Sequence, residues 1–148
     1  MNPETEYKFV PVDSHLRSFV IDLLRENNLP VSDLGEDKQL FALLQDGEVI
    51  GTGGLELLNN YALLRSISVR SDSRNKGLGT LITTALEAIS KQKAIDWVYL
   101  LTTTAKEFFS RDGYEVINRE DAPAAIKNTS EFSFICSSSS TLMRKCIS

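Results

Sequence analysis

The sequence is poor in the residues that build metal centres and covalent cross-links. Its 148 residues contain two cysteines and one histidine, His15. A His-rich metal site is therefore excluded, as is a Ser/His/Asp triad built on any other histidine. Cys136 and Cys146 have neither a metal-type nor a redox-type spacing, so both are expected to be thiols in a reducing compartment.

Long apolar runs and an excess of positive charge are also missing. No stretch approaches the roughly 18 apolar residues that a membrane helix needs, and the start of the chain lacks a basic segment followed by an apolar core. Sixteen Lys and Arg against twenty Asp and Glu give a net charge of −4, which disfavours nucleic acid as a partner. The length and the 42% apolar content predict one domain spanning residues 1–148. The missing apolar segments lead us to expect a cytoplasmic location.

Alternating and periodic segments predict a mixed sheet with flanking helices. Asp46-Gly47 and Asn59-Asn60 are turn signals that indicate antiparallel hairpins in the first half of the chain, and a strand, helix, strand, helix order follows. We expect an α/β (α+β) fold with a mostly antiparallel sheet of six to seven strands. The expected strands are 7–12, 38–44, 48–58, 61–69, 97–101, 114–117 and 141–147, and the expected helices are 16–24, 81–89, 104–111 and 124–127.

The sharpest local signal is a glycine turn between a buried strand and an amphipathic helix. Backbone N–H groups at a helix N-terminus have no partner within the helix, and together with the helix dipole they favour an anion. Glycines let the anion approach, and basic side chains add charge. The turn predicts a pyrophosphate site; in the alternative, the glycines only permit a tight turn. Its residues are Arg74, Asn75, Lys76, Gly77, Leu78, Gly79 and Thr80.

Two common phosphate-binding motifs are excluded. A Walker loop needs Gly-Lys-Ser or Gly-Lys-Thr after a glycine and four further residues, and that string is absent. A dinucleotide fingerprint needs glycine or alanine where Ile82 stands, and a turn that directly follows a strand. The glycine turn is therefore not expected to belong to a P-loop or Rossmann-type protein.

The glycine turn and a second motif together resemble the GNAT superfamily of N-acetyltransferases. The R-x-x-G-x-G/A pattern at 74–79 is followed about 25 residues later by the segment AKEFFSRDGY at 105–114. The resemblance covers nearly the whole chain. It implies acetyl-CoA (coenzyme A) as the donor, held between strands four and five, which are parallel and splayed. It also implies transfer of the acetyl group to the amine of a small molecule by direct attack on the thioester.

A narrower likeness is to the arsenic-resistance type of GNAT N-acetyltransferase. Four segments carry it, at 54–56, 63–66, 100–105 and 123–126, with Thr129 and Phe132 after them. This likeness implies that the acceptor is an amino acid or a toxic analogue of one.

The GNAT resemblance assigns backbone roles on the fourth strand. The segment Ile67, Ser68 and Val69 is implied to pair with pantetheine, and a bulge there is implied to free a backbone N–H, assigned to Ile67, for the oxyanion. Phe109 and Arg111 are implied to contact the coenzyme, Phe109 by packing against pantetheine.

Removal of the amine proton requires a base, because an alkylammonium cannot attack a thioester. Many relatives carry a glutamate on the fourth strand where this sequence has Arg65, which cannot act as a base. Glu56, on the neighbouring strand, is the candidate base; the alternatives are an exposed strand residue or a salt-bridge partner of Arg65. Arg65 and Ser66 are expected at the substrate, with Arg65 gripping a carboxylate or oxyanion.

Release of the thiolate lacks the usual acid. Many relatives carry a tyrosine where Phe109 stands, so Ser110, Tyr114 or water is left as the donor. A thiolate whose thiol has a pKa near about 8.5 can also leave without one. Thr102 and Thr103 are expected near the substrate, and one threonine hydroxyl in this stretch is expected to cap the next helix.

Two other functions stay open. A non-catalytic acyl-CoA-binding regulatory module is motivated by the missing tyrosine and by Arg65. A protein or peptide N-acetyltransferase needs an open groove, whereas the segment 119–140 is long enough to fold over the cleft. No metal, nucleic acid or membrane partner is expected, and a homodimer is left open.

Overall fold

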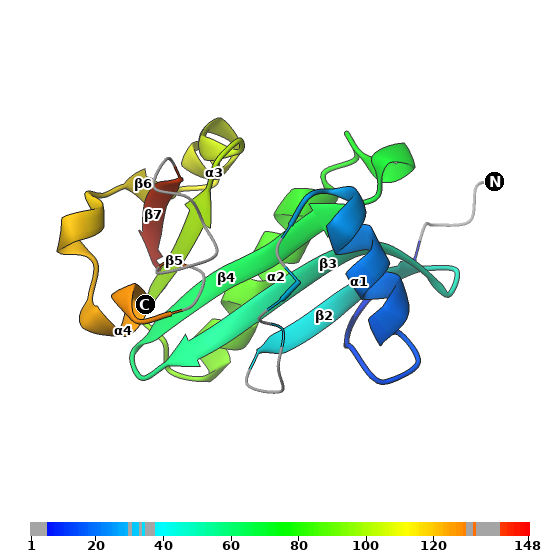
Figure 1. Ribbon diagram of the computed structural model, residues 1–148, viewed down its shortest axis with the longest axis horizontal. Helices are drawn as coiled ribbons and strands as arrows, with labels where there is room; N and C mark the ends of the chain where they lie inside the picture. The colour runs from blue at the N-terminus through cyan, green and yellow to red at the C-terminus, as the bar shows by residue number, and fades with distance from the viewer. Residues whose placement is uncertain (1–5, 30, 33, 35–37, 130–131, 133–139) are drawn as a thin grey trace. The chain divides into compact units, whose positions relative to one another are not determined.

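The computed structural model describes residues 6–29, 31–32, 34, 38–129, 132 and 140–148. Figure 1 follows its elements in chain order. No helix in these residues is both long enough and apolar enough to cross a membrane. The strands are β1 (Tyr7–Pro11), β2 (Gln39–Gln45), β3 (Glu48–Leu58), β4 (Tyr61–Val69), β5 (Trp97–Thr102), β6 (Glu115–Val116) and β7 (Thr141–Cys146), and the helices are α1 (Arg17–Glu26), α2 (Leu78–Gln92), α3 (Lys106–Arg111) and α4 (Ala124–Lys127), with 3₁₀ turns at Ser71–Ser73 and Arg119–Asp121.

The strands of the described residues form one mixed sheet in the order β1-β2-β3-β4-β5-β7-β6. β1 pairs with β2, and β7 with both β5 and β6, in antiparallel fashion. β4 and β5 pair in parallel through residues 61–64 and 97–100. The predicted mostly antiparallel sheet with a parallel β4 and β5 is confirmed. The predicted splay of these two strands beyond the paired residues stays a prediction.

The chain divides into two compact units. The first unit comprises residues 1–54 and 66–86, and the second unit comprises residues 55–65 and 87–148. The boundary between them cuts β3, β4 and α2. Each unit has its own hydrophobic core.

In the first unit, α1 covers one face of β2. Alternate residues of a strand point to opposite faces. Leu40 and Ala42 of β2 therefore share a face, and they pack against Val20 and Leu24, which lie on one stripe of α1. All four side chains are buried. The apolar spacing that predicted this helix is thus explained by its packing on the sheet.

Two glycines of β3 allow α2 to lie close to the sheet in this unit. A Cβ atom at Gly51 would lie 2.9 Å from the Ile82 side chain and 3.2 Å from the carbonyl oxygen of Ser68. A Cβ atom at Gly53 would lie 2.9 Å from Ile82 and 3.1 Å from Leu86. A side chain at either position would therefore force Ile82 and its neighbours to move. Because α2 begins at the glycine turn, this packing fixes where the turn lies relative to the end of β4.

The core of the second unit lies between β5, β7 and the segment that carries α4. Tyr99 and Leu142 pack with Ile126 of α4 and with Ala122. The guanidinium of Arg119 lies 4.5 Å from the centroid of the Phe132 ring, which is a cation–π contact. The long connection after β6 thus has structure of its own, as its length predicts.

The hairpin turns and several element bounds are confirmed. Asp46 and Gly47 have φ values of 52° and 81°, the two positive angles that a type I′ hairpin requires. Asn59 has a φ of 59° at the next turn. The predicted ranges 48–58, 61–69 and 124–127 match β3, β4 and α4.

Several predicted bounds were wrong, among them β6 and the starts of α1 and α3. α1 begins at Arg17, because the Asp13 carboxylate accepts the Leu16 N–H at 2.9 Å and holds a separate turn before the helix. α3 begins at Lys106 and not at residue 104. Pro123 precedes α4 with a ψ of 151°, so it caps the helix and is not its first residue. β6 has two residues where the pattern predicted four.

One of the two cysteines can be described. Cys146 is an exposed free thiol at the end of β7. Cys136 and the serine stretch 137–139 lie outside the described residues.

Candidate functional site

β4 contains a backbone interruption at Ser66. This residue has a φ of 56°, a left-handed conformation that few residues other than glycine adopt. A left-handed residue within a strand is a signature of a β-bulge, which re-aims the peptide groups around it. After it, Ser68 is buried while Ile67 and Val69 are half-buried. The resemblance placed a bulge and its freed N–H at Ile67–Val69, directly after Ser66; the role of that segment stays a prediction.

Thr52 of β3 contacts this interruption. Its hydroxyl donates a hydrogen bond to the carbonyl oxygen of Ser66 at 2.6 Å, and its Oγ1 lies 2.6 Å from the hydroxyl oxygen of Ser68. Thr52 is fully buried. Sequence reasoning missed this residue. The available signal was a lone hydroxyl among the three glycines of β3 at 51–54, in a strand that otherwise packs on apolar side chains.

The glycine turn follows β4 in the same unit. Asn75 and Gly77 have φ values of 65° and 75°. The N–H of Leu81 donates to the Gly77 carbonyl at 3.1 Å, so the N–H groups of 78–80 lie in the first turn of α2, where the helix offers no acceptor. A Cβ atom at Gly77 would meet no atom within 4 Å. Open space, donor groups and the helix dipole together fit the predicted anion.

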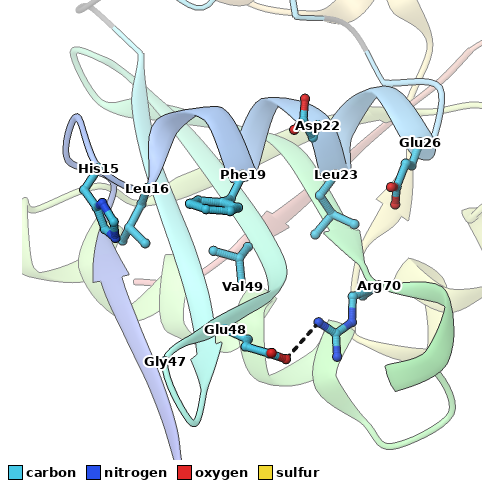
Figure 2. A pocket seen from close by; sticks show the side chains of 10 residues that line it. All are labelled: His15, Leu16, Phe19, Asp22, Leu23, Glu26, Gly47, Glu48, Val49 and Arg70. Atoms are coloured by element: carbon cyan, nitrogen blue, oxygen red, sulfur yellow. Dashed lines mark hydrogen bonds and ion pairs between the residues drawn. The ribbon is translucent and has the colours of Figure 1, made fainter.

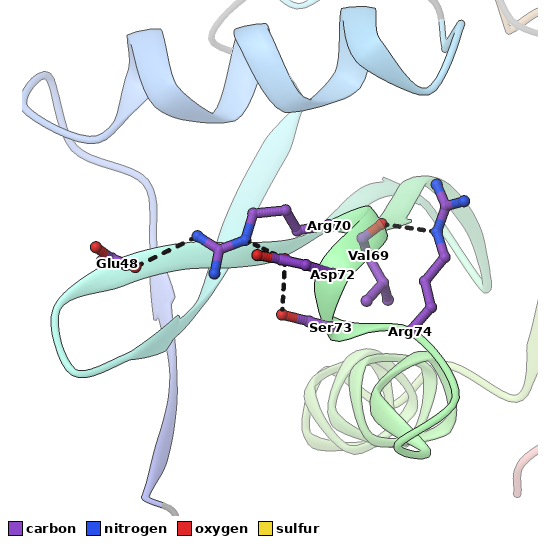
Figure 3. A network of polar contacts seen from close by, with 6 residues as sticks. All are labelled: Glu48, Val69, Arg70, Asp72, Ser73 and Arg74. Carbon is purple, nitrogen blue, oxygen red and sulfur yellow. Dashed lines mark hydrogen bonds and ion pairs between the residues drawn. The ribbon is translucent and has the colours of Figure 1, made fainter.

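The two basic residues of the turn differ in their contacts. Arg74 donates from Nε to the Val69 carbonyl at 3.2 Å, as Figure 3 shows, and from Nη2 to the side-chain oxygen of Asn27 beyond α1. Lys76 is exposed. Arg74 therefore ties the start of the glycine turn to the end of β4, and Lys76 is the more available cation for an anion.

The short segment between β4 and the turn is fixed by a polar network, drawn in Figure 3. Arg70 donates to Asp72 at 2.6 Å and to Glu48 at 3.4 Å, and the Ser73 hydroxyl donates to Asp72 at 3.3 Å. Hydrogen bonding to Arg70 holds the pKa of Asp72 below its ordinary value. The backbone N–H of Arg70 also donates to the backbone carbonyl of Ile50 at 2.7 Å. These exposed pairs orient the segment and contribute little to stability.

In the second unit, Glu56 and Arg65 form a buried ion pair. Arg65 Nη1 lies 3.3 Å from Glu56 Oε2, and the two side chains are 1% and 8% exposed, respectively. The salt bridge that the sequence left open is therefore present, and Glu56 is not an exposed strand residue. Removing one partner of such a pair leaves a buried charge, which costs about 3–5 kcal/mol.

The two phenylalanines of α3 differ in burial. The GNAT resemblance implies that Phe109 packs against pantetheine, which leaves Phe108 as the expected core residue. Phe109 is 7% exposed and packs edge-to-face on Phe108 and Tyr114, with centroid distances of 5.0 and 5.7 Å. Phe108 is half-buried. α3 therefore buries the ring of Phe109 more deeply than that of Phe108. Two adjacent aromatic residues in a sequence do not show which of them will be buried. The contact of Phe109 with a coenzyme stays a prediction.

The hydroxyl of Tyr114 is engaged within the second unit. It donates to Glu87 Oε2 at 2.8 Å, and Lys145 Nζ lies 3.1 Å from the other oxygen of Glu87. Burial, followed by the negative charge of Glu87, raises the pKa of Tyr114. A phenol that is harder to deprotonate is a poorer acid at neutral pH, so Tyr114 is a weak candidate for protonating the thiolate.

The remaining candidates lie around α3. The hydroxyl oxygen of Thr102 accepts the N–H of Ala105 at 3.0 Å, just before α3. The N-cap of α3 is Ala105 and the helix has no side-chain cap, so the predicted threonine cap was wrong. Thr103 is exposed. Arg111 is exposed and its Nε donates to the Glu107 carbonyl at 3.4 Å. The contacts predicted for these residues with substrate or coenzyme stay predictions.

A cavity of about 460 Å³ lies in the first unit between α1 and the β2–β3 hairpin. Figure 2 shows Phe19 of α1 above Val49, with Arg70 reaching Glu48. Phe19 is 54% exposed. The cavity contains none of the predicted site residues. It is lined by His15, Leu16, Phe19, Asp22, Leu23, Glu26, Gly47, Glu48, Val49 and Arg70.

Comparison with known proteins decides the family. Residues 36–116 match the family described as "Acetyltransferase (GNAT) domain". The chain belongs to the GNAT acetyltransferase family. The matched range includes β4 with its interruption, the glycine turn and the 105–114 motif, so the resemblance predicted from these motifs is confirmed. The prediction that a single domain spans 1–148 is not tested by it.

One curated relative and two solved structures illustrate the similarity. An uncharacterized N-acetyltransferase of Chlorobaculum tepidum is 32% identical over 90 residues, which are 60% of this chain and 57% of that protein. This chain thus matches little more than half of that relative's length. A GNAT acetyltransferase of Staphylococcus aureus has a TM-score of 0.77 at 18% identity, over 97% of this chain and 100% of the other.

The second solved structure is the N-acetylglutamate synthase of Neisseria gonorrhoeae, complexed with coenzyme A and N-acetyl-glutamate. It has a TM-score of 0.82 at 14% identity, over 99% of this chain and 36% of the other. At these identities the two structures show that the GNAT fold is shared.

Proposed function

We propose that this protein transfers an acetyl group from acetyl-CoA to the amine of a small, amino-acid-like acceptor. The observation that carries the proposal is the succession, within the first unit, of the Ser66 interruption in β4 and the open glycine turn at the start of α2. The first re-aims peptide groups of the strand, and the second presents unpartnered N–H groups to an anion. Together they supply backbone donors for both ends of a phosphorylated thioester.

The donor-binding residues follow from that succession. Lys76 and the N–H groups of 78–80 would hold the pyrophosphate, and the backbone of Ile67–Val69 would pair with pantetheine. Acetyl-CoA supplies the activated acetyl group when it is bound. The N–H of Ile67 would donate to the oxygen that gains negative charge during attack, a role that needs no side chain.

The acceptor-binding residues are proposed to be Glu56 and Arg65. An arginine whose planar group matches a carboxylate suits an amino acid better than a polyamine. The N-acetylglutamate synthase of Neisseria gonorrhoeae was solved in complex with N-acetyl-glutamate, which is an acetylated amino acid. This supports an amino-acid-like acceptor. Glu56 would accept the proton of the amine, directly or through water. The narrower likeness to the arsenic-resistance type stays a prediction, which the relatives named above do not test.

An acceptor screen tests the proposal. Free thiol released from acetyl-CoA is measured with amino acids, oxyanion-bearing analogues, polyamines and lysine-containing peptides, and acetyl-CoA binding is measured separately by calorimetry. We expect thiol release with amino-acid-like acceptors. If acetyl-CoA binds but no amine causes release of free thiol, the result would favour a non-catalytic acyl-CoA-binding module. The missing tyrosine and the Tyr114 hydroxyl, which is bonded to Glu87, are the observations that motivate this alternative. A preference for peptides would contradict the small-molecule acceptor.

A further inference from the structure

We propose that Thr52 is a positioning residue that aims the N–H of Ile67 through the carbonyl of Ser66. This inference rests on the proposed function, in which that N–H is the donor to the oxyanion. Thr52 is expected to touch neither the acceptor nor the donor. It acts through one buried hydrogen bond to the carbonyl of Ser66, the left-handed residue of β4.

The first step of the argument is that Ser66 needs to be held. A serine with a φ of 56° lies in a region that a side chain disfavours, and such a residue persists only where its surroundings fix it. Ser66 is 7% exposed, so its carbonyl also needs a partner. The Thr52 hydroxyl, 2.6 Å away, supplies both.

The second step assigns the protons. A threonine hydroxyl carries a single proton. Since that proton goes to the Ser66 carbonyl, the 2.6 Å contact between Thr52 and Ser68 requires the Ser68 hydroxyl to donate to Thr52. The result is a directed relay from Ser68 through Thr52 to Ser66. Hydrogen bonds in such a chain polarise and strengthen one another.

The third step links the relay to the proposed oxyanion donor. The carbonyl of Ser66 and the N–H of Ile67 belong to the same peptide group, which is planar and trans. The two bonds therefore point in opposite directions, and fixing the carbonyl toward Thr52 of β3 fixes the N–H of Ile67 away from Thr52. A hydrogen bond accepted by the carbonyl also makes the N–H of the same peptide a stronger donor.

The experiment removes the hydroxyl while preserving the shape of the side chain. Thr52→Val deletes the relay, Thr52→Ser keeps the hydroxyl, and Thr129→Val is the matched control. Thr129 is 5% exposed and its hydroxyl also donates to a backbone carbonyl, that of Ile126 at 2.7 Å, but it lies beyond α4 in the second unit. Each variant is compared with the wild type in thermal midpoint, kcat, KM for acetyl-CoA, and the amide proton shift and exchange rate of Ile67.

We expect Thr52→Val to lower kcat by about tenfold to a hundredfold with a smaller change in KM, since small displacements of an aligned donor cost rates of that order. The Ile67 amide signal should shift in the same variant. Thr52→Ser should stay within about threefold of the wild type, and Thr129→Val should lower the thermal midpoint while kcat stays unchanged. Ser68→Ala, which removes only the outer hydroxyl, should fall between the wild type and Thr52→Val.

Two results would overturn the role of Thr52. One is a Thr52→Val variant whose kcat and Ile67 amide signal match the wild type while its thermal midpoint drops as in Thr129→Val. The other is a Thr52→Ser variant as impaired as Thr52→Val. If Thr52→Val does not fold, the serine and Ser68→Ala variants carry the test. A wild-type protein that releases no thiol would sink the proposed function instead, and the Ile67 amide signal would still decide whether Thr52 holds that peptide.

Discussion

The two units of the chain use polar side chains in different ways. In the first unit, Thr52 and Arg74 bond to backbone carbonyls and thereby hold β4 and the glycine turn in unusual conformations. In the second unit, the Glu56–Arg65 and Glu87–Tyr114 pairs join side chain to side chain. The contrast holds for these residues and not for each whole unit, since Arg70 of the first unit bonds to Asp72 and Thr129 of the second to a backbone carbonyl. Under the proposed function, Thr52 and Arg74 would hold backbone donors in place, whereas Glu56 and Arg65 would bring charges that are already paired with each other.

The largest effect is expected from breaking the balanced charge of the second unit. Arg65→Met should lower the free energy of unfolding by about 3–5 kcal/mol, because it leaves the Glu56 carboxylate buried without this countercharge. Adding Glu56→Gln to the same chain should recover part of the loss. Urea denaturation of the single and double variants measures both values. A double variant no more stable than Arg65→Met alone would show that the pair is not coupled.

A variant of the Glu56–Arg65 pair also tests whether Glu56 is the base that accepts the amine proton. Glu56→Gln should lower kcat at neutral pH while acetyl-CoA binding changes little. The pH–rate profile of the variant should lose the limb that reports the base. An unchanged profile would leave Glu56 as a structural partner of Arg65 only.

A second prediction uses two glycines of the first unit as a matched pair. Gly77 and Gly47 both have a positive φ, of 75° and 81°, and a Cβ atom at either would meet no atom within 4 Å. Replacing either glycine with alanine should therefore lower the free energy of unfolding by a similar amount, roughly 1–2 kcal/mol. Only Gly77→Ala should weaken acetyl-CoA binding, by about tenfold or more, because its methyl group would occupy the open space beside the first-turn N–H groups. Calorimetry that found equal affinities in both variants would contradict the anion site.

The third prediction concerns the engaged phenol. Tyr114→Phe should cost about 1 kcal/mol of stability, since Glu87 keeps its contact with Lys145 and loses one hydrogen bond. kcat at neutral pH should stay within twofold of the wild type. A loss of thiol release in this variant would restore Tyr114 as the acid and weaken the contrast between the two units.

The smallest effect is expected at Asp112, beside this network. Its Oδ2 is buried and has no hydrogen-bond partner among the described residues. Burial, and next the charge of Glu87, raises the pKa of this carboxyl above its ordinary value of 3.8. The fold thus favours the protonated form of Asp112. The stability that this protonated carboxyl contributes is fully present below the ordinary pKa, and it is lost as the pH rises through the raised pKa of the folded protein.

Asp112→Asn should accordingly raise the thermal midpoint slightly at pH 7. The gain should disappear as the pH falls toward 4, where the wild-type carboxyl takes up its proton. Thermal unfolding across this pH range measures the difference. A gain that does not change with pH would show that the charge of Asp112 is not its cause.

The parts of the site that the sequence could predict are local ones. The glycine turn was found because a turn and a helix start are encoded within a few consecutive residues, and the φ of Gly77 bears this out. The hairpins at Asp46-Gly47 and at Asn59 were found for the same reason. The family resemblance then linked the turn to the 105–114 motif, and the family match confirms it.

The parts that escaped it depend on which distant residues become neighbours. Thr52 reaches Ser66 and Ser68 across 14 and 16 positions, and only the register of β3 with β4 brings them together. The burial of Phe109 in place of Phe108 depends on how α3 faces Tyr114. Neither relation leaves a pattern in consecutive residues.

By itself, the sequence determined the order of strands and helices, the hairpins and the glycine turn, because alternation, helical period and turn chemistry act over a few residues. The family followed from the resemblance of two motifs to GNAT proteins. Only the tertiary structure decided that Ser66 takes the left-handed conformation, that Thr52 holds its carbonyl, and that Glu56 is paired with Arg65. The physical reason is that burial and hydrogen-bond partners are set by packing between elements, and a strained residue or a buried charge persists only where that packing supplies its partner.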